Sequence, residues 1–311
     1  PVMNRVFVGM DVHKEKIVAV GLPEEGNHPV MREEFGGNDL SRLVKRLRQL
    51  AKGHRVEACY EAGPCGYGLA RALLGAGMEC RVAAPSLIPR RPGDRIKTDG
   101  RDARELALAF RANTLSFVRI PSREEEEVRG LIRCREDIAK EVRRVKHVIA
   151  HWLLIHEQRH PKGVKGWTQA HWRWMRGLEL SPMDRTVLDH YLDVLHLLVE
   201  RLKQIEQQVV ALAETAPYRE RVTRLRAFKG FSPLAAMRVI AEVMEFRRFP
   251  RAAAFMKFTG LVPSEYSSSD RIRRGRITKA GNSHLRCVLV EAVQRGTRSA
   301  RPGRDLLKRM A

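Results

Sequence analysis

The sequence predicts an α/β fold class: an N-terminal domain on a mixed sheet, a middle region of long helices, and a mainly helical C-terminal domain. Three observations predict it. Short β-rich runs alternate with amphipathic runs over the first third of the chain, helical periodicity then continues almost without Gly or Pro over 122–160, and helical patterns return after residue 216. With 311 residues, 43% of them hydrophobic, the chain can bury a sizeable core. We expect domains at 1–118, 119–216 and 217–311.

The N-terminal elements follow the order β-β-β-α-β-α-β-α. Strands are predicted over 5–11, 16–22, 30–35, 56–60 and 80–84, and helices over 40–50, 66–74 and 99–111. Asn38 is the expected N-cap of the first helix. In a mixed sheet of this order the first and fourth strands commonly lie side by side.

The middle region is predicted to hold two long helices, over 122–160 and 184–213, each with a single apolar seam. Such a pair forms either an antiparallel hairpin or a coiled-coil contact between protomers. Shorter helices are expected over 251–258 and 282–295, separated by a loop over 260–281.

The charge balance points to a nucleic-acid partner. Lys and Arg total 58 against 36 Asp and Glu, a formal net charge of +22.

No run approaches the ~18 apolar residues of a membrane helix, and no signal-peptide pattern is found. The five cysteines lack CxxC spacing, which argues against a disulfide framework or a zinc knuckle. We expect a cytoplasmic protein.

Four acids form the first candidate site. Asp11 and Glu61 end the first and fourth strands, and Asp99 and Asp102 share one face at the start of a helix. Carboxylates crowded together repel one another unless cations neutralise them, and all-oxygen sites suit Mg²⁺ or Mn²⁺. Two such ions can clamp the attacking and leaving oxygens of a phosphodiester. Alternatively, Asp99 merely caps its helix.

A serine-containing loop over 260–270 forms the second candidate site, because the stretch over 271–286 that follows it is basic and holds no acid. Guanidinium groups stabilise the charge that develops on a phosphate under attack, so a serine beside them can serve phosphodiester transfer. The alternative is a polar loop that binds the nucleic-acid backbone. The candidate nucleic-acid-binding residues are Lys97, Arg101, Arg271, Arg273, Arg274, Arg276, Lys279 and Arg286.

Residues 156–160 match the HExxH zinc signature. Pro161 follows directly and would place the motif at a fraying helix end, and no third ligand is evident. The sequence therefore argues against zinc catalysis.

Five segments in order resemble the DEDD transposases of insertion-sequence family one-ten. They are Val8-Gly-Met-Asp-Val-His-Lys14, Tyr60-Glu-Ala-Gly63, Lys97-Thr-Asp-Gly-Arg-Asp-Ala103, Phe258-Thr-Gly-Leu-Val-Pro263 and Thr278-Lys-Ala-Gly-Asn282. The resemblance implies an RNase H-like (RuvC-like) N-terminal domain, a coiled-coil middle and a helical transposase domain.

The resemblance also implies residue roles and partners. Asp11, Glu61, Asp99 and Asp102 would bind the metal, and Ser268, five residues after Pro263, would form a phosphoserine intermediate. Because Ser269 stands where the family often has glycine, Ser267 and Ser269 are rivals. Donor and target DNA, a guide RNA, and dimers or tetramers with composite sites are implied. Two alternatives are a RuvC-like nuclease that uses metal-activated water and a non-catalytic nucleic-acid-binding protein.

Overall fold

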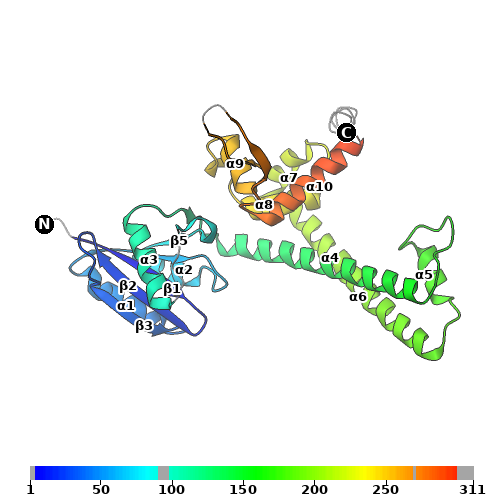
Figure 1. Cartoon of the computed structure of the whole chain (residues 1–311), viewed down its shortest axis with the longest axis horizontal. Coiled ribbons are helices and arrows are strands. Elements are labelled where there is room, and N and C mark those ends of the chain that lie inside the picture. Colours follow the sequence, from blue (N-terminus) through cyan, green and yellow to red (C-terminus); the bar gives the residue numbers. More distant parts are fainter. Residues whose placement is uncertain (1–3, 90–97, 269–270, 300–311) are drawn as a thin grey trace. The chain divides into compact units, whose positions relative to one another are not determined.

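A computed structural model describes residues 4–89, 98–268 and 271–299 of the chain. The chain divides into two compact units, Pro1–Ser122 and Arg123–Ala311, and each is described by itself (Figure 1). The first is mixed α/β and the second is mostly helical, in agreement with the predicted fold class.

A six-stranded mixed sheet forms the centre of the first unit. Its strands are β1 (Arg5–Val12), β2 (Lys16–Pro23), β3 (Met31–Gly36), β4 (Arg55–Glu61), β5 (Glu79–Ala83) and β6 (Phe117–Val118), in the order β3-β2-β1-β4-β5-β6. β1 runs parallel to β4, and β4 parallel to β5; the other pairs are antiparallel. The expected adjacency of the first and fourth strands is confirmed. The two-residue edge strand β6 was not predicted, because it is too short to show a pattern.

Helices cover both faces of this sheet. Met10 and Tyr60 on β1 and β4 belong to the buried cluster that also contains residues of α1 (Leu40–Ala51) and α2 (Gly68–Gly75). Phe7 packs on the opposite face with α3 (Asp99–Arg111). The prediction that Asn38 caps α1 is wrong: the Asp39 carboxylate accepts the Arg42 backbone N–H at 3.2 Å.

Two long helices, α4 (Arg123–Ile155) and α6 (Pro182–Ala213), pack side by side in the second unit (Figure 1). Ile132 near the start of α4 clusters with Val209 near the end of α6, whereas Ile149 clusters with Leu188. The helices are therefore antiparallel within one chain. Between them lies α5 (Gln169–Arg176).

The remaining elements of the second unit are α7 (Tyr218–Arg226), α8 (Pro233–Val243), α9 (Ala252–Thr259), β7 (Pro263–Glu265), β8 (Arg274–Ile277) and α10 (Ser283–Ser299). A single apolar cluster joins α4, α6, α7 and α8, with Ile132, Val209, Val222 and Ile240 among its members. The segment predicted as a plain loop over 260–281 contains the β7–β8 hairpin. Within the described ranges, no helix has the length and apolarity that crossing a membrane requires.

Candidate active site

The first candidate site lies where β1 ends and α3 begins. Asp11 precedes the last residue of β1, and Asp99 is the first residue of α3. The two meet because α3 packs directly on Gly9, where a Cβ atom would lie 2.2 Å from the carbonyl oxygen of Ala103. Since only a residue without a side chain permits that approach, Gly9 holds the first turn of α3 beside the end of β1.

Asp11, His13 and Asp99 form a group of possible metal ligands in the described part of the chain. One ligand atom of each lies within 4.8 Å of the others. His13 Nε2 is 3.1 Å from Asp11 Oδ2 and 3.7 Å from Asp99 Oδ1. The Asp11 and Asp99 side chains are only 22% and 33% exposed and His13 is 52% exposed, so the group is a shallow site that a cation can reach from solvent.

A lysine on β2 neutralises part of this group. Lys16 Nζ lies 2.5 Å from Asp99 Oδ2. This hydrogen bond lowers the pKa of Asp99 and, together with charge attraction, outweighs the opposing effect of desolvation; the same contact raises the pKa of Lys16. Asp99 is therefore held ionised, as a metal ligand must be.

Glu61 and Asp102 lie in the same part of the unit but outside that 4.8 Å group. The parallel register pairs Met10 with Tyr60, so Glu61 comes one position further, beside Asp11 on the neighbouring strand. Because successive strand residues alternate between faces, Asp11 and Glu61 are both on the α3 face. Asp102 is half-buried in the first turn of α3.

Sequence reasoning missed His13 and Lys16. His13 lies just beyond the end of β1, two residues after Asp11, where its backbone N–H donates to the Lys16 carbonyl at 2.9 Å and closes the turn into β2. Lys16 follows in the next strand, which pairs with β1 in a hairpin. No local signal joins Lys16 to Asp99, 83 positions away in the chain.

The second candidate site is the β7–β8 hairpin. The Ser267 hydroxyl donates to Glu265 Oε1 at 2.8 Å and accepts the Arg273 backbone N–H at 3.3 Å. Ser268 pairs with Arg271 through backbone hydrogen bonds, and among the described residues its hydroxyl has no partner. Ser269 lies outside the described residues. Of the two described serines, Ser268 therefore has the hydroxyl available for chemistry.

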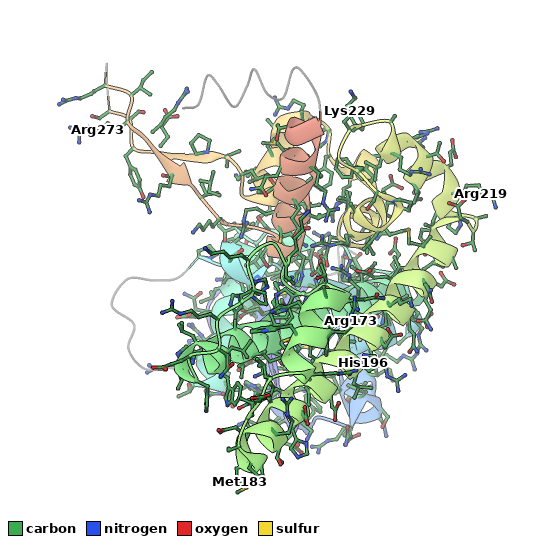
Figure 2. All side chains as sticks on the ribbon, turned by 90° about the vertical axis from the view of Figure 1, so that its right-hand side faces the viewer. Arg173, Met183, His196, Arg219, Lys229 and Arg273 are labelled. Atoms are coloured by element: carbon green, nitrogen blue, oxygen red, sulfur yellow. The ribbon has the colours of Figure 1, made fainter. Side chains whose placement is uncertain are left out.

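The predicted nucleic-acid-binding residues fall into three groups. Exposed cations on or beside the hairpin are Arg271, Arg273, Arg274, Arg276 and Lys279, and Arg273 points outward near its tip (Figure 2). Arg101 is exposed on α3, and Lys97 lies outside the described residues. Arg286 differs from the others: it is half-buried and donates from Nη1 to the Thr259 carbonyl at 2.9 Å, so it also fastens the end of α9.

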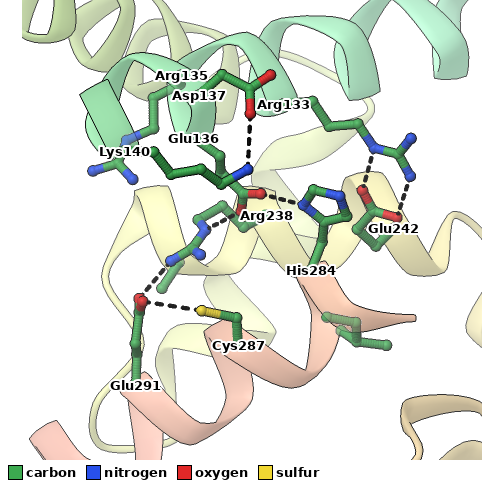
Figure 3. Close-up of polar contacts among 12 residues, drawn as sticks. Arg133, Arg135, Glu136, Asp137, Lys140, Arg238, Glu242, His284, Cys287 and Glu291 are labelled. Atoms are coloured by element: carbon green, nitrogen blue, oxygen red, sulfur yellow. Dashed lines mark hydrogen bonds and ion pairs between the residues drawn. The ribbon is translucent and has the colours of Figure 1, made fainter. Parts of the chain in front are cut away.

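The base of the hairpin is tied to a buried acid. Asn282 donates from Nδ2 to Glu242 Oε2 at 2.5 Å. Arg133 on α4 holds the same carboxylate with two hydrogen bonds of 3.0 and 3.1 Å (Figure 3). Burial favours the neutral form of Glu242, but these partners outweigh it and lower its pKa. Asn282 Oδ1 also accepts the Leu285 backbone N–H at the start of α10. The chain leaving β8 is thereby anchored to α8 and α4.

A second buried ion-pair network fastens α10 (Figure 3). Arg238 on α8 donates to Glu136 of α4 at 2.8 Å and to Glu291 of α10 at 2.6 Å. His284 on α10 also bonds Glu136. Arg238 and Glu136 are each 7% exposed, so the pairing satisfies charges that would otherwise be buried without partners.

The HExxH residues do not form a helical metal site. α4 ends at Ile155, Glu157 has φ +58°, and His160 follows outside the helix. His156 Nδ1 instead meets the Trp152 carbonyl at 2.8 Å. The two imidazoles therefore do not share a helix face.

Comparisons with known proteins agree with these features. A family model described as Transposase, of the DEDD type, matches residues 8–156, and one described as Transposase IS116/IS110/IS902 family matches residues 222–308. The first match contains Asp11 and Asp99, and the second contains Ser268 and the basic hairpin.

Named transposases cover much of the chain. The chain is 36% identical over 295 residues to a protein of Sinorhizobium fredii named as transposase y4qE, which covers 93% of this chain and 71% of the relative. It is 33% identical over 249 residues to the transposase for insertion sequence element IS1533 of Leptospira borgpetersenii, covering 78% and 71%. It is 23% identical to the transposase for IS1111A of Coxiella burnetii, covering 93% and 77%. The chain is thus a DNA transposase that belongs to the IS110/IS116 family of insertion-sequence transposases.

Proposed function

We propose that this transposase cleaves and exchanges DNA strands with a divalent cation, Mg²⁺ or Mn²⁺, held by an RNase H-like (RuvC-like) N-terminal unit, and with Ser268 as nucleophile. The observation that carries the proposal is the approach of Asp11, His13 and Asp99 to within 4.8 Å at the end of β1. The strand order, with α3 packed over β1, supports the RuvC-like assignment.

The residues present fit a hard cation. Asp11 and Asp99 supply carboxylate oxygens, the donors that Mg²⁺ and Mn²⁺ prefer, and Glu61 and Asp102 would complete the set. Lys16 occupies Asp99 with its ammonium group and must release one oxygen when a cation binds. The bound cation would supply charge stabilisation at the phosphodiester under attack.

Ser268 would then act on the scissile phosphate. Its oxygen forms a bond to phosphorus, its hydroxyl proton leaves, and the bond from phosphorus to one deoxyribose oxygen breaks, with that oxygen taking up a proton. A hydroxyl on the receiving strand reverses the step and frees the serine. Arg271 and Arg273, which are exposed on the same hairpin, would neutralise phosphate charge.

Partners follow from the same proposal. Donor and target DNA would bind the exposed cations, and a guide RNA would supply target sequence by base pairing, by analogy with other guided systems. The α4–α6 pair would act as a coiled-coil element in a dimer or tetramer, where the acids of one protomer serve the serine of another. We place its action in the cytoplasm at the nucleoid, and the division between 119–216 and 217–311 stays a prediction.

Three variants test the proposal on a DNA substrate that contains the element's end. Ser268→Ala should abolish a covalent protein–DNA adduct on denaturing gels, Ser267→Ala should retain it, and Asp11→Asn should lose cleavage. Cleavage that persists without an adduct in Ser268→Ala would instead indicate a RuvC-like nuclease that uses activated water. Sequencing of RNA that co-purifies with the transposase tests guidance, and recovery of bulk degraded RNA alone would contradict it.

A further inference from the structure

An open pocket of about 710 Å³ lies at the end of the α4–α6 pair where α5 packs. Its lining comes from the end of α4, the following turn and α5, and includes Leu154, Gln158, His160, Trp167, His171 and Trp174. No part of the catalytic proposal uses this pocket.

Flat rings form one wall of this pocket. His171 and Trp174 stack with ring centroids 5.2 Å apart at an interplanar angle of 22°. His160 lies 4.4 Å from His171, and Trp167 meets His171 edge-on at 5.4 Å. Four aromatic rings are thus gathered within one short stretch of chain.

The aromatic wall is fixed in place by its own polar contacts. His171 is 4% exposed, and its Nδ1 accepts the Trp167 backbone N–H at 3.1 Å. Thr168 caps α5 by accepting the His171 backbone N–H. A wall ordered in advance loses little conformational entropy when a ligand stacks on it.

The segment that forms the pocket is strongly basic, and one of its cations, Arg159, lines the pocket together with the acid Glu157. Residues 157–176 contain one acid, Glu157, and five exposed cations: Arg159, Lys162, Lys165, Arg173 and Arg176. Figure 2 faces this end of the helix pair, where Arg173 is labelled. Within the described residues none of the five forms an ion pair with a carboxylate, although Arg176 lies over the Trp172 ring at 5.8 Å, so their charge is available to an anionic partner.

An apolar protein segment would fit the rings but would leave the cations of this segment without counter-charges. A flat ligand linked to repeated anions satisfies both features. We propose that the pocket binds an unpaired base of single-stranded nucleic acid, with Arg159 on a neighbouring phosphate and the other cations of the segment 157–176 available to the strand that continues from it. Aromatic platforms beside basic grooves bind single strands in this way, independently of base-edge recognition.

The test compares labelled 12-nucleotide single strands that carry all bases with strands that are abasic at the central four positions. RNA and DNA versions are titrated separately against the full chain by fluorescence anisotropy. In the wild type the base-bearing strand should bind roughly fivefold or more tightly than the abasic one, as expected for base stacking on an aromatic ring. The ratio of the two dissociation constants, abasic over base-bearing, isolates stacking, because the remaining basic surface binds both strands through their phosphates.

The matched variants are Trp174→Leu and Trp172→Leu, on the same helix. Trp172 does not line the pocket and packs edge-on against His196. The ratio should approach one in Trp174→Leu and stay as in the wild type in Trp172→Leu. His160→Ala, an exposed pocket residue, gives the same test where Trp174→Leu fails to fold.

If the pocket variants lose the preference for the base-bearing strand with RNA alone, the pocket binds RNA, and if they lose it with DNA alone, the pocket binds DNA. If they lose it with both, the pocket accepts either strand. Each of these results supports the proposal. An unchanged ratio in the folded pocket variants, or an equal loss in Trp172→Leu, overturns it. Neither result bears on the acids or on Ser268, so the outcome is independent of the proposed catalytic function.

Discussion

Lys16 and Asp99 form an ion pair, with Nζ 2.5 Å from Oδ2, that joins β2 to the first residue of α3. Both groups remain partly exposed, at 41% and 33%. The carboxylate that is offered to a cation is therefore already shared with a positive charge of the protein itself. Lys16 can keep the site ordered before metal binds and must compete with the metal afterwards.

Lys16→Ala should tighten Mn²⁺ binding by about three- to tenfold, because the cation no longer displaces an ammonium group from Asp99. Isothermal titration calorimetry measures the change. Lys14→Ala is the control, since Lys14 is 93% exposed and, among the described residues, its ion pair is with the neighbouring Glu15. Equal Mn²⁺ affinities of the wild type and Lys16→Ala would contradict the competition.

Gly9→Ala should destabilise the N-terminal unit by roughly 1–3 kcal/mol, as overpacking does in close-packed cores. The new methyl group would lie 2.2 Å from the Ala103 carbonyl oxygen and 2.5 Å from the Ala107 nitrogen, so α3 must move. Urea denaturation gives the stability, and weaker Mn²⁺ binding is the second expected effect. Gly53→Ala serves as the control, because a Cβ atom there meets nothing within 4 Å. Equal behaviour of the two variants would count against the close approach of α3.

Glu242→Gln should lower the free energy of unfolding of the second unit by about 1–3 kcal/mol, because one amide cannot satisfy both Arg133 and Asn282 in a buried site. Limited proteolysis should then cut the hairpin over 260–281 faster. Glu220→Gln is the matched control: Glu220 also pairs with an arginine, Arg224, but both side chains are over 70% exposed, and such pairs contribute roughly 0–1 kcal/mol. If both variants lost the same stability, the anchoring role of Glu242 would be wrong.

The wild-type protein should lose thermal stability on acidification below about pH 6.5. Burial, reinforced by His160, lowers the pKa of His171 beneath its ordinary value of 6.5. The unfolded chain then takes up a proton more readily than the folded one, so stability rises with pH through this window and levels off above it. Protonation would also remove the Nδ1 acceptor of the Trp167 N–H.

Differential scanning fluorimetry at pH 7.5 and 5.5 checks this dependence. His171→Gln keeps an acceptor without a titrating group, so its melting temperature should fall less between the two values. A His171→Gln variant that loses as much thermal stability on acidification as the wild type would assign the dependence to other groups.

The periodicity of the sequence predicted most elements of both units, since buried strands and amphipathic helices leave repeating patterns. Periodicity did not predict the features that depend on individual contacts rather than on a repeating pattern. Asp39 rather than Asn38 caps α1, α4 ends at Ile155 although its pattern continues to residue 160, and the exposed β7–β8 hairpin has no buried face to produce alternation.

The candidate site was predictable only in part. The positions of Asp11 at a strand end and Asp99 at a helix start indicated that they could meet, and the structure brings them together. The Glu136–Arg238 and Glu136–His284 contacts span 102 and 148 positions of the chain. The sequence holds no local signal for these contacts, which become visible once α4, α8 and α10 are packed together.

The buried ion pairs that connect α4 with α8 and α10 affect what happens when a copy of the insertion sequence acquires a stop codon in its transposase gene. A stop codon ahead of α8 would leave Glu136 on α4 without Arg238 and His284, and would leave Ile132 without the α8 part of its apolar cluster, which includes Ile240. Such a shortened product should be cleared by proteases rather than accumulate as a DNA-binding competitor. Truncated copies of the gene would then yield no stable protein, and the full-length transposase would not be inhibited by shortened chains that bind the same DNA.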